Sequence, residues 1–261
     1  MVLDPRVETL VKAAGEGDLD TVRHIIKDGV SIHAINGLGV SALTNASMMG
    51  HADVVQFLLD NGSKGGEKWS VLEIEALSLA CASGHLSVVK LLLGAGFVDL
   101  QKDTPGAIQL LHQPPPLVAA SSSGHLDIVE YLLQEGMDPN NSKSRSYSSA
   151  YGEKGEGETA LTAATSNGNL EVVKTLIASG ADVNKEGKHG DTAYTLAKRF
   201  KHKDILEFLL QHGAKPSSKF KDQNQNKLNI GNFANLGLKL GKGPTNLVAE
   251  SRDKGSVTRD V

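Results

Sequence analysis

A repeat with a spacing of 33 or 34 residues is the feature that most constrains how this chain can fold. A tight-turn motif, made of a glycine followed by histidine or another polar residue, recurs along the chain. Its glycines are Gly17, Gly50, Gly84, Gly124 and Gly168, and Lys201 takes the place of the glycine in a sixth copy. The spacings are 33, 34, 40, 44 and 33 residues, so two intervals contain insertions. A repeat of this length is typical of solenoids, which stack one supersecondary unit on the next.

The residues before each turn predict a short first helix. An alanine stands four residues before every turn, which indicates a contact too close for a larger side chain. These alanines are Ala13, Ala46, Ala80, Ala120, Ala164 and Ala197. A leucine stands seven residues before the turn in five copies, and Tyr194 stands there in the sixth.

The residues after each turn predict a longer second helix. Pairs of aliphatic residues such as Val54-Val55 are followed four residues later by a second pair such as Leu58-Leu59, and this spacing forms one apolar stripe along a helix. A glycine then follows in each copy, at Gly29, Gly62, Gly96, Gly136, Gly180 and Gly213. Because glycine accepts the left-handed conformation that closes a helix, we expect each second helix to end there.

Two segments bring the chain close to a known consensus. Residues 157–164, GETALTAA, and residues 180–184, GADVN, resemble the ankyrin-repeat family. The Thr-Pro-Leu-His opening of that consensus is replaced by Ser-Ala-Leu-Thr at 41–44 and by Pro-Pro-Leu-Val at 115–118. The resemblance implies an all-α repeat solenoid over residues 4–214, with about six helix-turn-helix repeats and short β-hairpin fingers. The polar residues Lys198, Arg199, Lys201 and Lys203 make the sixth repeat resemble a C-terminal cap.

Three segments lie outside the repeat. Insertions near residues 99–114 and 141–156 fall in the connections that follow second helices, and we expect either tolerated surface loops or loops that widen the binding face. The serine-rich second insertion is also a candidate for phosphorylation. Residues 215–261 are predicted to form a basic, mostly disordered tail. Within it, residues 228–240 are either a docking motif or a segment that folds back on the last repeat.

Charge and composition narrow the class of protein. The tail carries nine Lys or Arg and four Asp or Glu, a net charge of +5, so the first 214 residues carry −8. Since phosphate contacts dominate nucleic-acid binding, an acidic body argues against that function. The N-terminus has no signal-peptide pattern and no apolar run is long enough to span a membrane. We expect a monomeric intracellular protein, cytoplasmic with the nucleus as the alternative.

No residue pattern indicates an enzyme, a metal site or a cofactor. The recurring histidines (His51, His85, His125 and His202) are about a repeat apart, roughly 10 Å, whereas zinc needs ligand nitrogens at about 2.0–2.1 Å. The single cysteine, Cys81, has no activating partner in the sequence and is expected to be an inert thiol.

The function that the resemblance implies is protein binding. We expect a scaffold or adaptor that holds partner proteins through its finger tips and the concave face of its first helices. The candidate partner-binding residues are Asn36, Leu38, Met48, Met49, Trp69, Lys185, Lys188, His189 and Arg199. The alternative is a regulatory subunit or inhibitor of an enzyme, in which the array blocks a target site and the C-terminal tail takes part.

Overall fold

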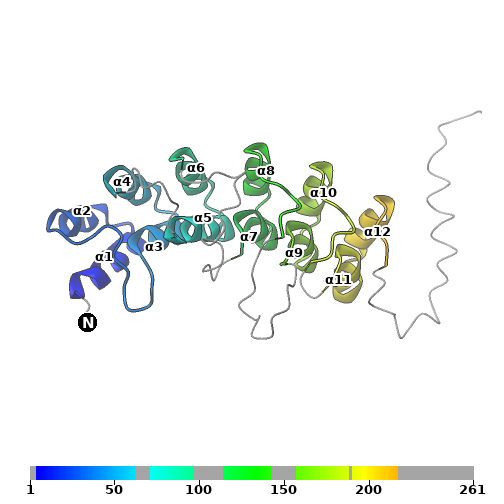
Figure 1. Cartoon of the computed structure of the whole chain (residues 1–261), viewed down its shortest axis with the longest axis horizontal. Helices are drawn as coiled ribbons and strands as arrows, with labels where there is room; N and C mark the ends of the chain where they lie inside the picture. The colour runs from blue at the N-terminus through cyan, green and yellow to red at the C-terminus, as the bar shows by residue number, and fades with distance from the viewer. Residues whose placement is uncertain (1–3, 63–70, 97–113, 143–156, 188–189, 217–261) are drawn as a thin grey trace, which may run out of the picture. The chain divides into compact units, whose positions relative to one another are not determined.

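The computed structural model describes residues 4–62, 71–96, 114–142, 157–187 and 190–216. Two rows of helices run through these residues (Figure 1). The odd-numbered row is α1 (Pro5–Glu16), α3 (Ala42–Met49), α5 (Val71–Ser83), α7 (Pro116–Ser123), α9 (Ala160–Ser166) and α11 (Ala193–Phe200). The even-numbered row is α2 (Leu19–Lys27), α4 (Ala52–Gly62), α6 (Leu86–Gly94), α8 (Leu126–Gln134), α10 (Leu170–Ala178) and α12 (Lys203–Gln211).

Each odd-numbered helix packs against the even-numbered helix that follows it and against the odd-numbered helices of the neighbouring repeats. We call the odd-numbered helices inner and the even-numbered helices outer. This arrangement is an all-α repeat solenoid, as the periodicity of the sequence predicts. Apart from an antiparallel bridge between Ile35 and Ser41, the described residues form no β-structure.

One hydrophobic core runs from repeat to repeat. The six alanines that precede the turns are all buried, and so are the aliphatic pairs at the start of the second helices, except for the partly buried Leu206. Leu10, Leu77 and Leu132 are fully enclosed, although no single helix pair could cover them. Burial of such a side chain stabilises the fold by roughly 1.5–3 kcal/mol. Stability therefore accumulates at the interfaces between repeats.

Hydroxyl side chains define the start of several inner helices. Ser41 Oγ accepts a hydrogen bond from the Thr44 backbone N–H at 3.1 Å, and Thr44 Oγ1 accepts one from the Ser41 N–H at 2.9 Å. The same reciprocal pair forms between Thr159 and Thr162 and between Thr192 and Thr195. These capping boxes satisfy backbone donors that a helix start leaves open. The variant opening at 41–44 therefore still begins a helix.

The glycines after the outer helices follow the sequence prediction with one exception. Gly29, Gly96, Gly136, Gly180 and Gly213 all have φ between 75° and 93°, the left-handed region. Gly62 is different, because it is the last residue of α4 and is not left-handed. A Cβ at Gly62 would lie 2.3 Å from Ile32 Cγ2, so close packing explains this glycine. The prediction that Gly62 closes its helix in the left-handed conformation is wrong.

The described helices do not include one that is both long and apolar enough to cross a membrane.

Candidate partner-binding face

A row of hydrogen bonds joins the turn of each repeat to the inner helix of the repeat before it. The donor is the histidine, or in one case the asparagine, that follows the turn residue, and the acceptor is a carbonyl at the end of the preceding inner helix. The bonds are His51 Nε2 to Gly15 O (2.9 Å), His85 Nε2 to Met48 O (3.1 Å), His125 Nε2 to Ala82 O (3.1 Å), Asn169 Nδ2 to Ser122 O (3.0 Å) and His202 Nε2 to Ser166 O (3.3 Å). We call this row the turn ladder. A carbonyl only accepts, so each imidazole carries its proton on Nε2.

The turn glycines are required by the same ladder. Each has φ between 75° and 82°, and each lies against the ladder residue of the next repeat. A Cβ added at Gly17, Gly50, Gly84, Gly124 or Gly168 would come within 2.6–2.9 Å of that side chain. In the sixth repeat Lys201 occupies this position with φ 63°. It is the one non-glycine residue with positive φ in the described part of the chain.

The two residues before each turn form a strip of partly or fully exposed residues, which we call the inner strip. Its residues are Gly15, Glu16, Met48, Met49, Ala82, Ser83, Ser122, Ser123, Ser166, Asn167, Arg199 and Phe200. Five of the carbonyls in this strip are the acceptors of the turn ladder. The ladder therefore fixes the backbone of a strip whose residue pairs change along the array.

The chemistry of the inner strip changes along the array. Met49 is half exposed and gives the second repeat an apolar surface. The middle repeats carry small, uncharged residues, and Asn167 Nδ2 donates to Ser122 Oγ at 3.1 Å across the boundary between α9 and α7. The sixth repeat carries Arg199 and Phe200, both exposed. To a partner, the second repeat can therefore offer an apolar contact, the middle repeats hydrogen bonds, and the sixth repeat positive charge.

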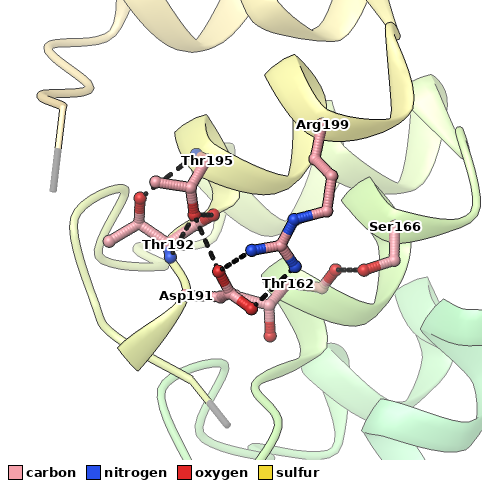
Figure 2. A network of polar contacts seen from close by, with 6 residues as sticks. All are labelled: Thr162, Ser166, Asp191, Thr192, Thr195 and Arg199. Atoms are coloured by element: carbon pink, nitrogen blue, oxygen red, sulfur yellow. Dashed lines mark hydrogen bonds and ion pairs between the residues drawn. The ribbon is translucent and has the colours of Figure 1, made fainter. Parts of the chain in front are cut away.

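Arg199 is held by an acidic residue that precedes its helix (Figure 2). Its Nη1 and Nη2 donate to the two carboxylate oxygens of Asp191 at 3.0 and 2.7 Å, and Thr195 Oγ1 lies 3.4 Å from Asp191 Oδ1. The Asp191 side chain is 11% exposed and that of Arg199 is 45% exposed. A bidentate pair of this kind fixes the plane of the guanidinium. The pairing partner of Arg199 is not evident from the sequence pattern.

The first finger, residues 35–41, presents one large apolar side chain. Leu38 is 85% exposed at its tip. Asn36 lies beneath the tip and is 8% exposed, because its Oδ1 accepts from the backbone N–H groups of Leu38 and Val40, both at 3.0 Å. Asn36 therefore shapes the finger from inside and is not displayed on its surface. Leu38 is the residue that the finger displays.

The remaining predicted site residues divide into two groups. Met48 and Lys185 are partly buried, and the Lys185 backbone N–H closes a turn onto Asp182 O at 3.1 Å. Trp69, Lys188 and His189 lie outside the described residues. Most of the two insertions, residues 97–113 and 143–156, and residues 217–261 of the tail lie outside them as well.

The part of the chain that the structure describes holds no group of three or more His, Cys, Asp or Glu side chains that could bind a metal ion. Cys81 is fully buried, and burial raises the pKa of its thiol. Because a thiol reacts as its thiolate, Cys81 is unreactive in the folded chain.

A family model for ankyrin repeats (three copies) matches residues 10–104, 71–143 and 117–220. These matches cover most of the sequence, so the chain belongs to the ankyrin-repeat family. Ankyrin repeats are in general protein–protein interaction modules, and their fold is not a catalytic one.

Individual relatives are similar to parts of this chain. The ankyrin repeat and KH domain-containing protein mask-1 of Caenorhabditis elegans is 30% identical over 141 residues, and protein fem-1 homolog A-like of Mus musculus is 32% identical over 104 residues. These segments cover 49% and 40% of this chain but only 5% and 14% of those proteins. The crystal structure of the human ASB11 ankyrin repeat domain has a TM-score of 0.64 and 24% identity, and covers 91% of this chain and 99% of its own. That likeness concerns the fold alone.

Proposed function

We propose that this chain is a scaffold or adaptor that binds a partner protein along the inner strip, with Leu38 of the first finger as an additional contact. The observation that carries the proposal is the separation of two roles within the strip. The carbonyls of the strip are fixed by the turn ladder, whereas the exposed side chains, which belong to the residue after each ladder carbonyl, change along the array from Met49 through two serines to Asn167. A fixed backbone with variable side chains favours specific recognition, because little ordering entropy is lost on binding.

The proposed face offers contacts of the kind found in protein interfaces. Leu38 and Met49 are exposed apolar side chains that a partner can desolvate. Ser83 and Ser123 are small, so a partner backbone can approach the inner helices closely. Arg199 is of a residue type enriched among the positions that dominate binding energy, and its guanidinium is already oriented.

Site-specific photocrosslinking of the full chain tests this proposal. A photoreactive residue is placed at Ser83 or Ser123 in the strip, and at Gln56 or Glu130 on the outer helices as matched exposed controls. The chains are illuminated in an extract of the source cells. We expect the same protein to be crosslinked from both strip positions and from neither control.

A substitution then measures the strip directly. Ser123→Arg places a bulky cation in the middle of the strip, and we expect it to weaken binding of the crosslinked partner by at least about ten-fold, or roughly 1.4 kcal/mol. The circular dichroism spectrum should be unchanged, because Ser123 is exposed. Crosslinks obtained only from Gln56 or Glu130 would show that the outer helices form the binding face.

The alternative function, inhibition of an enzyme with help from the tail, depends on residues 215–261. Only Lys215 and Pro216 of that segment are among the described residues. We therefore propose the adaptor, whose binding face lies among the described residues.

A further inference from the structure

The sixth repeat carries a concentrated positive charge where α11 turns into α12. Residues 198–203, KRFKHK, contain four Lys or Arg and no Asp or Glu. We call the surface formed by Lys198, Arg199, Phe200, Lys201 and Lys203 the basic corner, and all five side chains are exposed. The remaining basic residues of the described chain do not form such a run, and the first 214 residues carry a net charge of −8.

Fold stability does not account for two of these cations. Lys201 has φ 63°, a conformation that costs a residue with a Cβ free energy. Lys203 is the first residue of α12, where the helix dipole disfavours a positive charge. The equivalent positions in the other repeats are glycine and an apolar residue, such as Gly168 and Leu170. A polar face on the terminal repeat serves as a cap, but it does not require cations at these two positions, and a residue that breaks a local rule is a candidate for function.

Arg199 and Phe200 connect the basic corner to the inner strip. Both belong to the strip, and the bidentate contact with Asp191 holds the guanidinium in place (Figure 2). Phe200 is half exposed between two cations. The corner therefore combines the exposed charges of Lys201 and Lys203 with an apolar contact at one end of the face that we propose for binding.

We infer that the basic corner binds an acidic segment of the partner protein, whose chain continues along the inner strip toward Met48 and Met49. This inference rests on the proposed function and adds the chemistry and direction of the bound segment. Carboxylates of Asp or Glu pair with Lys201 and Lys203, and a neighbouring apolar side chain packs on Phe200. The uncharged residues Ser166 and Asn167 then receive the uncharged part of the segment.

Charge complementarity favours an acidic protein segment over two other occupants. The C-terminal tail of the chain has a net charge of +5, which does not complement the basic corner. A nucleic acid carries a phosphate at every nucleotide and binds largely through phosphate contacts. The cations stop at the corner, because the adjoining strip residues Ser166 and Asn167 are neutral and the rest of the array is acidic. A short acidic stretch of protein fits a positive surface of this extent.

The spacing of the repeats sets the length of the bound segment. The inner helices α3 and α11 are four repeats apart. Packed helices are about 8–10 Å apart, and an extended chain advances about 3.3 Å per residue. An acidic residue at the corner and an apolar residue at Met48 or Met49 are therefore separated by about 10–12 residues of partner sequence.

Selection from a displayed library of random 16-residue peptides tests the inference. The full chain is compared with three variants: Lys201→Gly/Lys203→Gln, which removes two charges without touching Asp191; Ser123→Arg; and Lys27→Gln/Lys174→Gln, a matched control on the outer helices. We expect the full chain and the control to enrich peptides with clustered Asp or Glu about 10–12 residues from an apolar residue. An enriched peptide, labelled with a fluorophore, should bind the Lys201→Gly/Lys203→Gln variant on the order of ten-fold more weakly.

The variants separate failure of this inference from failure of the proposed function. One outcome would overturn the inference and leave the proposed binding along the strip intact. In that outcome the enriched peptides have no excess of Asp or Glu, do not bind the Ser123→Arg variant, and bind the Lys201→Gly/Lys203→Gln variant as tightly as the parent chain. Peptides that bind Ser123→Arg unchanged would contradict both. A selection that enriches no peptide also overturns the inference, because it requires a linear acidic segment. If the inference holds, the enriched peptide should bind far more weakly in 500 mM salt than in 50 mM salt, because salt screens exposed charges.

Discussion

The imidazole of His125 lies against Gly84 of the preceding repeat, and a Cβ at Gly84 would come within 2.6 Å of His125 Cε1. The same ring donates to the Ala82 carbonyl at 3.1 Å. One side chain therefore holds two repeats together and forbids a side chain at the turn beneath it. Because of this relationship, the addition of a single methyl group at a turn glycine has a large structural consequence.

Gly84→Ala should destabilise the array by about 3 kcal/mol, because it adds left-handed strain to a steric clash with His125. Gly29→Ala is the matched control, since Gly29 has φ 87° and nothing lies within 4 Å of its added Cβ. It should cost only the strain, about 1 kcal/mol. Urea unfolding followed by circular dichroism measures both. Equal losses for the two variants would show that the contact with His125 is unimportant.

Lys201→Gly should stabilise the sixth repeat by about 1 kcal/mol, because glycine adopts φ 63° without strain. Lys201→Ala removes the same charge but keeps a Cβ, so its midpoint of unfolding should stay close to that of the parent chain. A gain with alanine as large as the gain with glycine would mean that charge, and not backbone conformation, limits stability there.

The contact between Asp191 and Arg199 should contribute a coupling free energy of about 0.5–1 kcal/mol, a modest value because the Arg199 side chain is 45% exposed to water. A double-mutant cycle with Asp191→Ala and Arg199→Ala in urea unfolding gives this quantity. Arg199→Lys should lose most of it, because lysine cannot form the bidentate pair. If the Arg199→Lys variant is as stable as the parent chain, the positive charge alone accounts for the coupling and the bidentate geometry does not contribute.

Asp18 should make the stability of the first repeat depend on acid pH. Hydrogen bonds from the Thr21 hydroxyl and backbone N–H hold the pKa of the Asp18 carboxyl below its ordinary value near 3.8. A lowered folded-state pKa means that the stabilisation is fully present above this ordinary value and is lost as the pH falls through the folded pKa. Asp18→Asn should therefore destabilise the chain at pH 7 and approach the parent at pH 2.5. Thermal unfolding at the two pH values measures this, and a difference that persists undiminished at pH 2.5 would contradict it.

The sequence predicts the helix pairs well because their cause is local and periodic. Leu58 and its counterparts Leu92, Leu132, Leu176 and Leu209 are all buried, as the spacing indicates. The second residue of the pair is buried at Leu59 but exposed at Leu210. The prediction for Gly62 is wrong because the sequence does not show whether a glycine is needed for a left-handed backbone or for close packing of a neighbour such as Ile32. Which of the two applies depends on packing between repeats.

The candidate site was less accessible from the sequence. Leu38, Met49 and Arg199 lie on exposed surface, but whether they bind a partner remains a prediction. The internal position of Asn36 depends on the path of the finger backbone, and the pairing of Arg199 with Asp191 depends on how α11 follows its loop. In the turn ladder the sequence shows glycine and histidine side by side in each copy. Each histidine, however, contacts the turn glycine of the preceding repeat and not the glycine beside it in sequence. A pattern that is the same in every repeat does not show which of these glycines is the partner.

Lys201 also determines how far the array can be lengthened. In each earlier repeat, the position occupied by Lys201 must be a glycine, because the ladder residue of the next repeat packs against it. A side chain at this position occupies the space that the ladder residue of a further repeat would need, so another repeat cannot stack in the same geometry. Duplicating a middle repeat should therefore extend the molecule, whereas fusing a repeat after the sixth should leave it unstacked until Lys201 is replaced. The array thus carries a built-in limit on its length in a single residue.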